Sequence, residues 1–179
     1  MAGPVVWLTG LPGAGKSTVA RLVAEALQRQ GRAVTVLDGD EIRRTISRDL
    51  GYSAADRDEN VRRVIALASE HRGADHPVLV ALVSPLVRQR EAARRVLEPE
   101  FAEVHVRASL RTCVSRDPKG LYERALAGQI AAFTGVSSPY EAPREPELVL
   151  DTECEAPGDS AAKVLALLAR LEPRATRTG

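Results

Sequence analysis

The chain has 179 residues, 25 of them basic and 24 acidic, so its net charge is +1. This length fits a single domain with a sizeable core, and the balanced charge argues against a general nucleic-acid or membrane surface. The longest strongly apolar run, 78–83, is too short to span a bilayer, and we expect no signal peptide before the first strand. Cys113 and Cys154 form no C-x-x-C pair, which favours a reduced, cytoplasmic setting. We expect one domain over 1–173 and a disordered tail over 174–179.

A phosphate-binding loop follows the first predicted strand, Val5 to Leu8. The sequence there fits G-x-x-x-x-G-K-[ST], and an apolar helical stripe from Val19 to Leu27 follows. Glycines allow backbone N–H groups to surround phosphate oxygens, and the helix adds its positive end. We therefore predict ATP or GTP binding, with the Lys16 ammonium at the β- and γ-phosphates and the Ser17 hydroxyl on Mg²⁺. The predicted nucleotide-binding residues are Gly10, Leu11, Pro12, Gly13, Ala14, Gly15, Lys16, Ser17, Thr18 and, farther along the chain, Arg116.

A second strand, predicted over 33–37, ends at two carboxylates, Asp38 and Asp40. We predict a helix directly after it, with two arginines near its start and three residues pointing inward. The arginines are Arg43 and Arg44, and the inward residues are Ile42, Thr45 and Ile46.

The next helix is predicted over 54–72, with Ser53 as its N-cap and Asp56 at the capping-box position. Its apolar stripe, extended backwards at helical spacing, reaches Arg57 and Asn60. A polar side chain on an inward face needs a partner. Either these two residues pair with nearby carboxylates or they face a polar ligand, and we favour the ligand.

The rest of the chain alternates strands and helices. Strands are predicted over 77–83, 101–106 and 148–150, and helices over 87–97, 110–114, 121–127 and 159–171. This alternation predicts an α/β fold of the P-loop kinase type: a doubly wound sheet of about five mostly parallel strands with helices on both faces. Residues from about 116 to 135, punctuated by glycine and proline, are predicted to form a mobile lid.

Ligands of such sheets bind beyond the carboxyl ends of the strands, where the phosphate loop, Asp38 to Asp40 and Ser84-Pro85 all fall. The chain lacks the N-K-x-D motif of GTPases, and its central strand ends in Ser84 rather than an acidic residue, which argues against a motor ATPase. A small-molecule kinase fits better. In it, Asp38 and Asp40 contact metal-bound water and acceptor, Arg43, Arg57 and Asn60 bind a polar anionic acceptor, and Arg116 and Lys119 belong to the lid. Tyr52 and Phe133 either stack on a base or simply cover loop edges.

Several runs resemble the adenylyl-sulfate kinase family in order and spacing across nearly the whole chain. They are the phosphate loop, LDGD over 37–40 with Arg43, LGYS over 50–53, DRDENVRR over 56–63, Ser84-Pro85 with Arg90, RDPKGLY over 116–122, FTG over 133–135, PYE over 139–141 and PEL over 146–148.

The resemblance implies transfer of the ATP γ-phosphoryl group to the 3′-hydroxyl of adenylyl sulfate, with Mg²⁺, by an enzyme that is commonly a homodimer. The implied catalytic residues are Lys16, Asp38, Asp40, Ser84 and Lys119. The implied acceptor-binding residues are Asp40, Arg43, Tyr52, Arg57, Asn60, Val83, Ser84, Pro85, Lys119, Leu121 and Phe133. Ser84 matches the family's phosphoserine position, although a direct in-line transfer needs only positioning and charge stabilisation.

The sequence also departs from the family pattern. Leu86 replaces a common Tyr, residues that are usually Lys or Arg are Glu123, Leu126 and Ala131, and Arg107 and Ser109 replace Asp and Pro. Two alternatives therefore stay open: a kinase for another nucleotide or a small hydroxyl compound, and a non-catalytic nucleotide-binding subunit.

Overall fold

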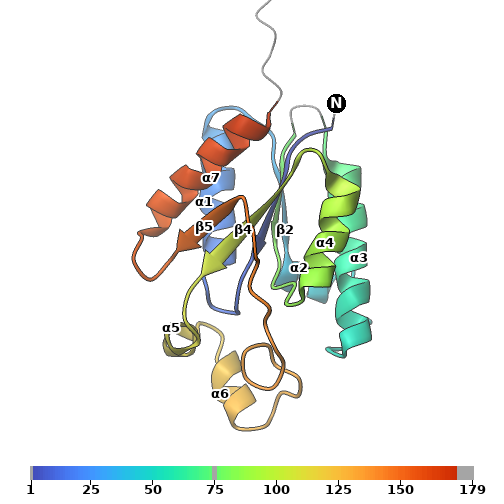
Figure 1. Cartoon of the computed structure of the whole chain (residues 1–179), viewed down its shortest axis with the longest axis vertical. Coiled ribbons are helices and arrows are strands. Elements are labelled where there is room, and N and C mark those ends of the chain that lie inside the picture. The colour runs from blue at the N-terminus through green and yellow to red at the C-terminus, as the bar shows by residue number, and fades with distance from the viewer. Residues whose placement is uncertain (1, 74–75, 173–179) are drawn as a thin grey trace, which may run out of the picture.

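A five-stranded parallel sheet organises the computed structural model, which describes residues 2–73 and 76–172 (Figure 1). The predicted tail, 174–179, lies outside these residues. The strands are β1 (Val5–Thr9), β2 (Thr35–Asp38), β3 (Val78–Ala81), β4 (Phe101–Arg107) and β5 (Leu148–Asp151), in the spatial order β2-β3-β1-β4-β5. All four strand pairs are parallel. β1 is central and wholly buried, which explains its unbroken apolar run.

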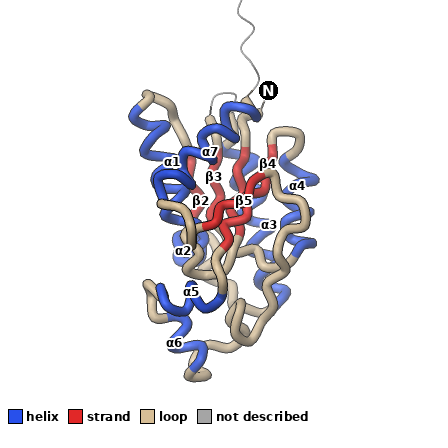
Figure 2. Tube along the Cα trace, turned by 60° about the vertical axis from the view of Figure 1, so that its left-hand side comes forward, coloured by secondary structure: helices blue, strands red, loops and turns tan. Residues whose placement is uncertain are grey.

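Two pairs of long helices cover the two faces of the sheet (Figures 1 and 2). α1 (Lys16–Arg29) and α7 (Pro157–Leu171) share one apolar cluster with the side chains of Val6 and Leu8. α3 (Ala54–His71) and α4 (Val87–Leu97) enclose a second cluster around Trp7. This confirms the predicted α/β fold. None of the helices in the described ranges is both long and apolar enough to cross a membrane.

Three short helices lie towards the carboxyl ends of the strands. They are α2 (Gly39–Arg44), α5 (Leu110–Arg116) and α6 (Leu121–Leu126). Figure 1 shows α5 and α6, with the loop that follows them, projecting beyond the sheet on that side. This projecting part holds most of the segment predicted as a lid.

The prediction for the second helix was partly wrong. α2 ends at Arg44, so Arg43 and Arg44 lie in its last turn rather than near its start. Thr45 and Ile46 are exposed, because the turn after α2 breaks the helical spacing on which their inward placement depended. Ile42 is buried as predicted, and Ser47 takes the next buried position.

Candidate functional site

The phosphate loop connects β1 to α1 at the centre of the sheet edge. Gly13 and Gly15 have φ values of 78° and 107°, in the left-handed region that residues with a Cβ rarely adopt. A Cβ on Gly13 would also lie 3.3 Å from the carbonyl oxygen of Cys113. The glycines therefore allow both the loop's backbone shape and its close packing on α5.

Lys16 is 8% exposed, and its Nζ donates hydrogen bonds to the carbonyl oxygens of Gly10 (2.9 Å) and Leu11 (2.8 Å). Burial lowers the pKa of its ammonium group to about 8. The ammonium is thus held inside the loop, as a compact charge that a polyphosphate would stabilise.

Two hydroxyl groups hold outward-facing carbonyls of the same loop. The Tyr122 hydroxyl, from α6, donates to Pro12 O (2.8 Å), and the Thr152 hydroxyl, just after β5, donates to Ala14 O (2.8 Å). Arg116 donates in turn to Thr152 Oγ1 (3.0 Å) and Thr152 O (2.6 Å). Neither Tyr122 nor Thr152 was predicted to be a site residue, because only the folded arrangement places them at the loop.

The carboxylates that follow β2 meet the phosphate loop and the predicted lid. Ser17 Oγ donates to Asp38 Oδ2, and Asp38 also caps α2 by accepting from the Asp40 backbone N–H (2.9 Å). Asp40 pairs with Lys119, which lies between α5 and α6, and both side chains are about half exposed. Two contacts, one between Ser17 and Asp38 and one between Asp40 and Lys119, therefore join four of the predicted catalytic or metal-binding residues at one edge of the sheet.

Arg57 joins two segments that are far apart in sequence. Its Nε donates to Tyr52 O (3.1 Å), and its terminal nitrogens donate to Thr134 Oγ1 and Ala132 O. Burial, followed by the nearby positive charge of Arg43, lowers the pKa of the Arg57 guanidinium. Asp56 lies near Arg43, but neither Arg43 nor Arg57 forms a salt bridge with any residue that the structure describes, so the two arginines create a positive site suited to an anion.

Asn60, one turn after Arg57, is 3% exposed. Within the described ranges, its Oδ1 is one of two buried side-chain polar atoms without a hydrogen-bond partner; the other is Ser47 Oγ. A carboxylate cannot donate to this oxygen, so pairing with a carboxylate does not explain it, and the ligand-facing interpretation of Asn60 stays a prediction.

The two aromatic residues predicted to stack on a base lie in different contacts. Tyr52 is 57% exposed, with the Arg43 guanidinium 4.8 Å from its ring centre. Phe133 packs edge-on against Tyr122, with ring centres 5.0 Å apart. Arg57 donates to the backbone carbonyls of Tyr52 and Ala132. It therefore connects the segment that contains Tyr52 to the segment that contains Phe133, although the two rings are not in contact.

Ser84, three residues after the end of β3, is buried and has a positive φ of 37°. Its Oγ accepts from Trp7 Nε1 (3.0 Å) and donates to Leu82 O (3.2 Å). The neighbouring carbonyls are also occupied: Val83 O accepts from Thr9 Oγ1 (2.6 Å) and Pro85 O from the Glu141 N–H (2.8 Å). Among the described residues, the Ser84 hydroxyl therefore bonds to no titratable side chain that could act as a general base.

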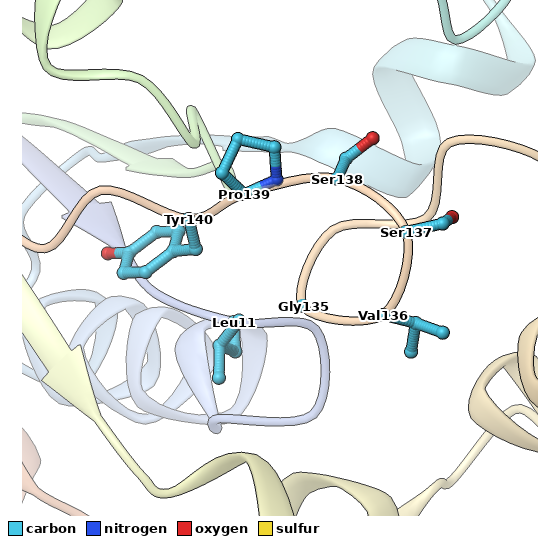
Figure 3. Close-up of a pocket in the computed structure, with 7 residues that line it drawn as sticks. All are labelled: Leu11, Gly135, Val136, Ser137, Ser138, Pro139 and Tyr140. Carbon is cyan, nitrogen blue, oxygen red and sulfur yellow. The ribbon is translucent and has the colours of Figure 1, made fainter.

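A pocket opens between Leu11 of the phosphate loop and residues 135–140 (Figure 3). Gly135 lies tightly against the loop, because a Cβ there would come within 3.0 Å of Leu11 Cδ2. Tyr140 closes one end, where its hydroxyl lies 3.1 Å from Thr9 Oγ1. Residues 135–140 were not predicted to line a pocket, because no local sequence pattern brings them next to Leu11. Leu121, at the start of α6, is half-buried outside it.

Comparison with known proteins agrees with this geometry. Residues 2–151 match the Adenylylsulphate kinase family. The adenylyl-sulfate kinase of Geotalea uraniireducens (strain Rf4) is 51% identical over 149 residues, covering 83% of this chain and 72% of that protein. The bifunctional enzyme NodQ of Rhizobium sp. (strain BR816) is 50% identical over 167 residues; the match covers 93% of this chain but only 26% of NodQ.

Among solved structures, the Mycobacterium tuberculosis APS kinase CysC in complex with AMPPNP and APS superimposes with a TM-score of 0.90. It is 44% identical, and the match covers 94% of this chain and 98% of that one.

Proposed function

Because this chain belongs to the adenylylsulphate kinase family, it is an ATP-dependent adenylyl-sulfate kinase, and we propose that transfer takes place between the phosphate loop and the Arg57 segment. The observation that carries this placement is the contact between Asp40 and Lys119. It brings a carboxylate suited to the acceptor hydroxyl next to a cation suited to the moving phosphoryl group.

On the nucleotide side, loop N–H groups and Lys16 hold the ATP phosphates. The bonded oxygens of Ser17 and Asp38 are the hard ligands that Mg²⁺ prefers, so these residues fit a magnesium site. When bound, the ion would neutralise charge on the phosphate oxygens. Arg116, fixed on Thr152, lies on the nucleotide side of the lid.

On the acceptor side, Arg43 and Arg57 bind the anionic group of adenylyl sulfate, and Asn60 accepts a hydrogen bond through its free Oδ1. Tyr52 and Phe133 flank the adenine, while Leu121 and the backbone of Val83, Ser84 and Pro85 complete the acceptor-binding site. In the transfer, the acceptor 3′-oxygen bonds to the γ-phosphorus as the bond to the β-phosphate oxygen breaks. The hydroxyl proton passes to the Asp40 carboxylate, and ADP leaves.

We further propose that residues 1–173 act as one domain with a lid over about 116–135, and that the enzyme is a cytoplasmic homodimer. The family resemblance supports the dimer, and two free cysteines, Cys113 and Cys154, agree with a reduced compartment. Light scattering of the purified chain tests the assembly; a monomer or hexamer would contradict it.

Acceptor-dependent ADP release tests the function and its alternatives. Measured with adenylyl sulfate, with other nucleotides, with small hydroxyl compounds and with no acceptor, release should be stimulated by adenylyl sulfate and yield 3′-phosphoadenylyl sulfate. Stimulation by another acceptor alone would point to the second kinase hypothesis. ATP binding without stimulated release by any acceptor would indicate a non-catalytic subunit.

We expect ATP affinity to fall with pH above about 8. Bound phosphates favour the charged form of Lys16, so its pKa in the complex lies above the value of about 8 in the free protein. The full affinity is present below that pH, and above it binding must take up a proton, at a cost of up to about tenfold in affinity per pH unit.

Calorimetry with a non-hydrolysable ATP analogue, in buffers of different ionisation enthalpy, measures both affinity and proton uptake. A Lys16→Ala variant should bind the ATP analogue weakly and should no longer take up a proton on binding. Wild-type affinity that stays flat up to pH 9.5 would show that Lys16 does not titrate on binding.

Replacing Ser84 with alanine should leave most of the turnover, because its hydroxyl is bonded to Trp7 and Leu82 and, in the part of the chain that the structure describes, to no general base. Stability should fall by about 1–3 kcal/mol, since the buried Trp7 N–H loses its acceptor. Turnover per folded molecule and thermal unfolding separate the two effects. A loss of turnover of about a thousandfold or more, with the fold intact, would favour a phosphoserine intermediate.

A further inference from the structure

One buried side chain contacts both halves of the site. Tyr122 is 1% exposed; its hydroxyl donates to Pro12 O in the phosphate loop, and its ring packs edge-on against Phe133. Burial raises the pKa of Tyr122, so the hydroxyl remains a donor at neutral pH. The tyrosine thus touches the nucleotide-binding loop with one end and the acceptor-side segment with the other.

The contact continues from Phe133 to the acceptor wall. The next residue, Thr134, is buried and accepts from Arg57, which also holds Ala132 O and Tyr52 O. Gly135 lies close to Leu11, and a Cβ on it would be 3.9 Å from the Tyr122 hydroxyl. Tyr122 therefore occupies the junction between the phosphate loop and residues 132–135.

We propose that Tyr122 is a positioning residue that couples the nucleotide site to the acceptor site. Phosphates seated in the loop fix the Pro12 carbonyl, which fixes the Tyr122 ring and, through it, the position of Phe133. An acceptor stacked on Phe133 stabilises the same arrangement from the other side. Each ligand then lowers the cost of ordering the site for the other, so each raises the other's affinity by the same factor. This inference rests on the proposed placement of ATP and adenylyl sulfate.

The coupling factor is measured by titrating a non-hydrolysable ATP analogue with and without saturating adenylyl sulfate. Tyr122→Phe removes the bond to Pro12 and keeps the ring contact with Phe133. Loss of one hydrogen bond of ordinary strength corresponds to about a fivefold loss of coupling. Thr35→Val is a matched control, because it removes a half-buried hydroxyl bonded to His76 at the opposite, amino end of β2.

Phe133→Leu breaks the connection at its other end and should lower the coupling factor as well. Combined with Tyr122→Phe, it should add little, since both variants interrupt one connection. The coupling factor is a ratio of two affinities for the ATP analogue measured on the same variant. Weaker binding of adenylyl sulfate by that variant therefore does not by itself change the factor.

The inference would be overturned if the Tyr122→Phe variant and the Phe133→Leu variant both retained the wild-type coupling factor. Wild-type protein that binds both ligands without coupling would also overturn it and leave the enzymatic activity standing. Wild-type protein that binds neither ligand would instead refute the proposed sites.

Discussion

Asp40→Asn should lower turnover by about 10²–10⁴-fold while binding of an ATP analogue survives. The amide keeps the size of the side chain but cannot accept the proton of the acceptor hydroxyl, and it loses the charge that pairs with Lys119. The phosphate loop is held by Lys16, Tyr122 and Thr152, none of which needs Asp40. Single-turnover phosphoryl transfer and separate nucleotide titrations measure the two effects.

Glu41→Gln is the matched control for Asp40→Asn. Glu41 is the next residue of α2, is exposed and undergoes the same carboxylate-to-amide change. Its turnover should stay close to that of the wild type. Near-normal turnover of Asp40→Asn would show that Asp40 does not act on the reacting hydroxyl. An equal loss of turnover in both variants would show that the effect comes from the total negative charge of α2.

Arg90→Ala should destabilise the fold by about 3–5 kcal/mol. The arginine is 2% exposed and donates to Glu103 (2.6 Å), whose side chain is 12% exposed. It also donates to the carbonyls of Ser84 (2.7 Å) and Glu141 (2.6 Å). Its removal leaves the mostly buried Glu103 carboxylate with only Arg94, 3.8 Å away, as a cationic neighbour among the described residues, and takes the Arg90 donor from two carbonyls. Chemical denaturation should show the loss.

Arg88→Ala provides the comparison on the same helix. Arg88 pairs with Asp58, but the two side chains are 57% and 44% exposed, so the loss should be at most about 1 kcal/mol. Replacing Glu103 together with Arg90 by apolar residues should recover part of the lost stability, because no unpaired charge remains. If Arg88→Ala and Arg90→Ala lowered the free energy of unfolding equally, burial would not be the reason for the large effect expected at Arg90.

The sequence was sufficient for the architecture and for much of the site. The buried run of β1, the phosphate loop and the carboxylates after β2 are local patterns, and parallel strands bring their carboxyl ends to one edge. The extension of the apolar stripe of α3 to Arg57 and Asn60 also needed only helical spacing. Asn60 is buried as that spacing predicts.

The remaining features depend on contacts between distant residues. Tyr122 and Pro12 are 110 positions apart, and Thr152 and Ala14 are 138 apart, so no local pattern relates them. The hydrogen bond from Trp7 to Ser84 likewise requires β1 and β3 to be neighbours. The error in α2 arose from a local pattern rather than from a distant contact. The helical spacing was extended past Arg44, where the helix ends and the chain turns.

The anchoring of the proposed lid determines what its opening costs. Its first residue, Arg116, is bonded to Thr152, and the loop near its other end, at Ala132 and Thr134, is bonded to Arg57. Between these fixed ends, the contact between Lys119 and Asp40 joins the lid to α2, and both side chains are about half exposed. An exposed ion pair contributes only about 0–1 kcal/mol. Separating Lys119 from Asp40 therefore costs little more than thermal energy, whereas lifting the rest of the proposed lid would also break the bond from Tyr122 to Pro12 and the packing of Tyr122 on Phe133.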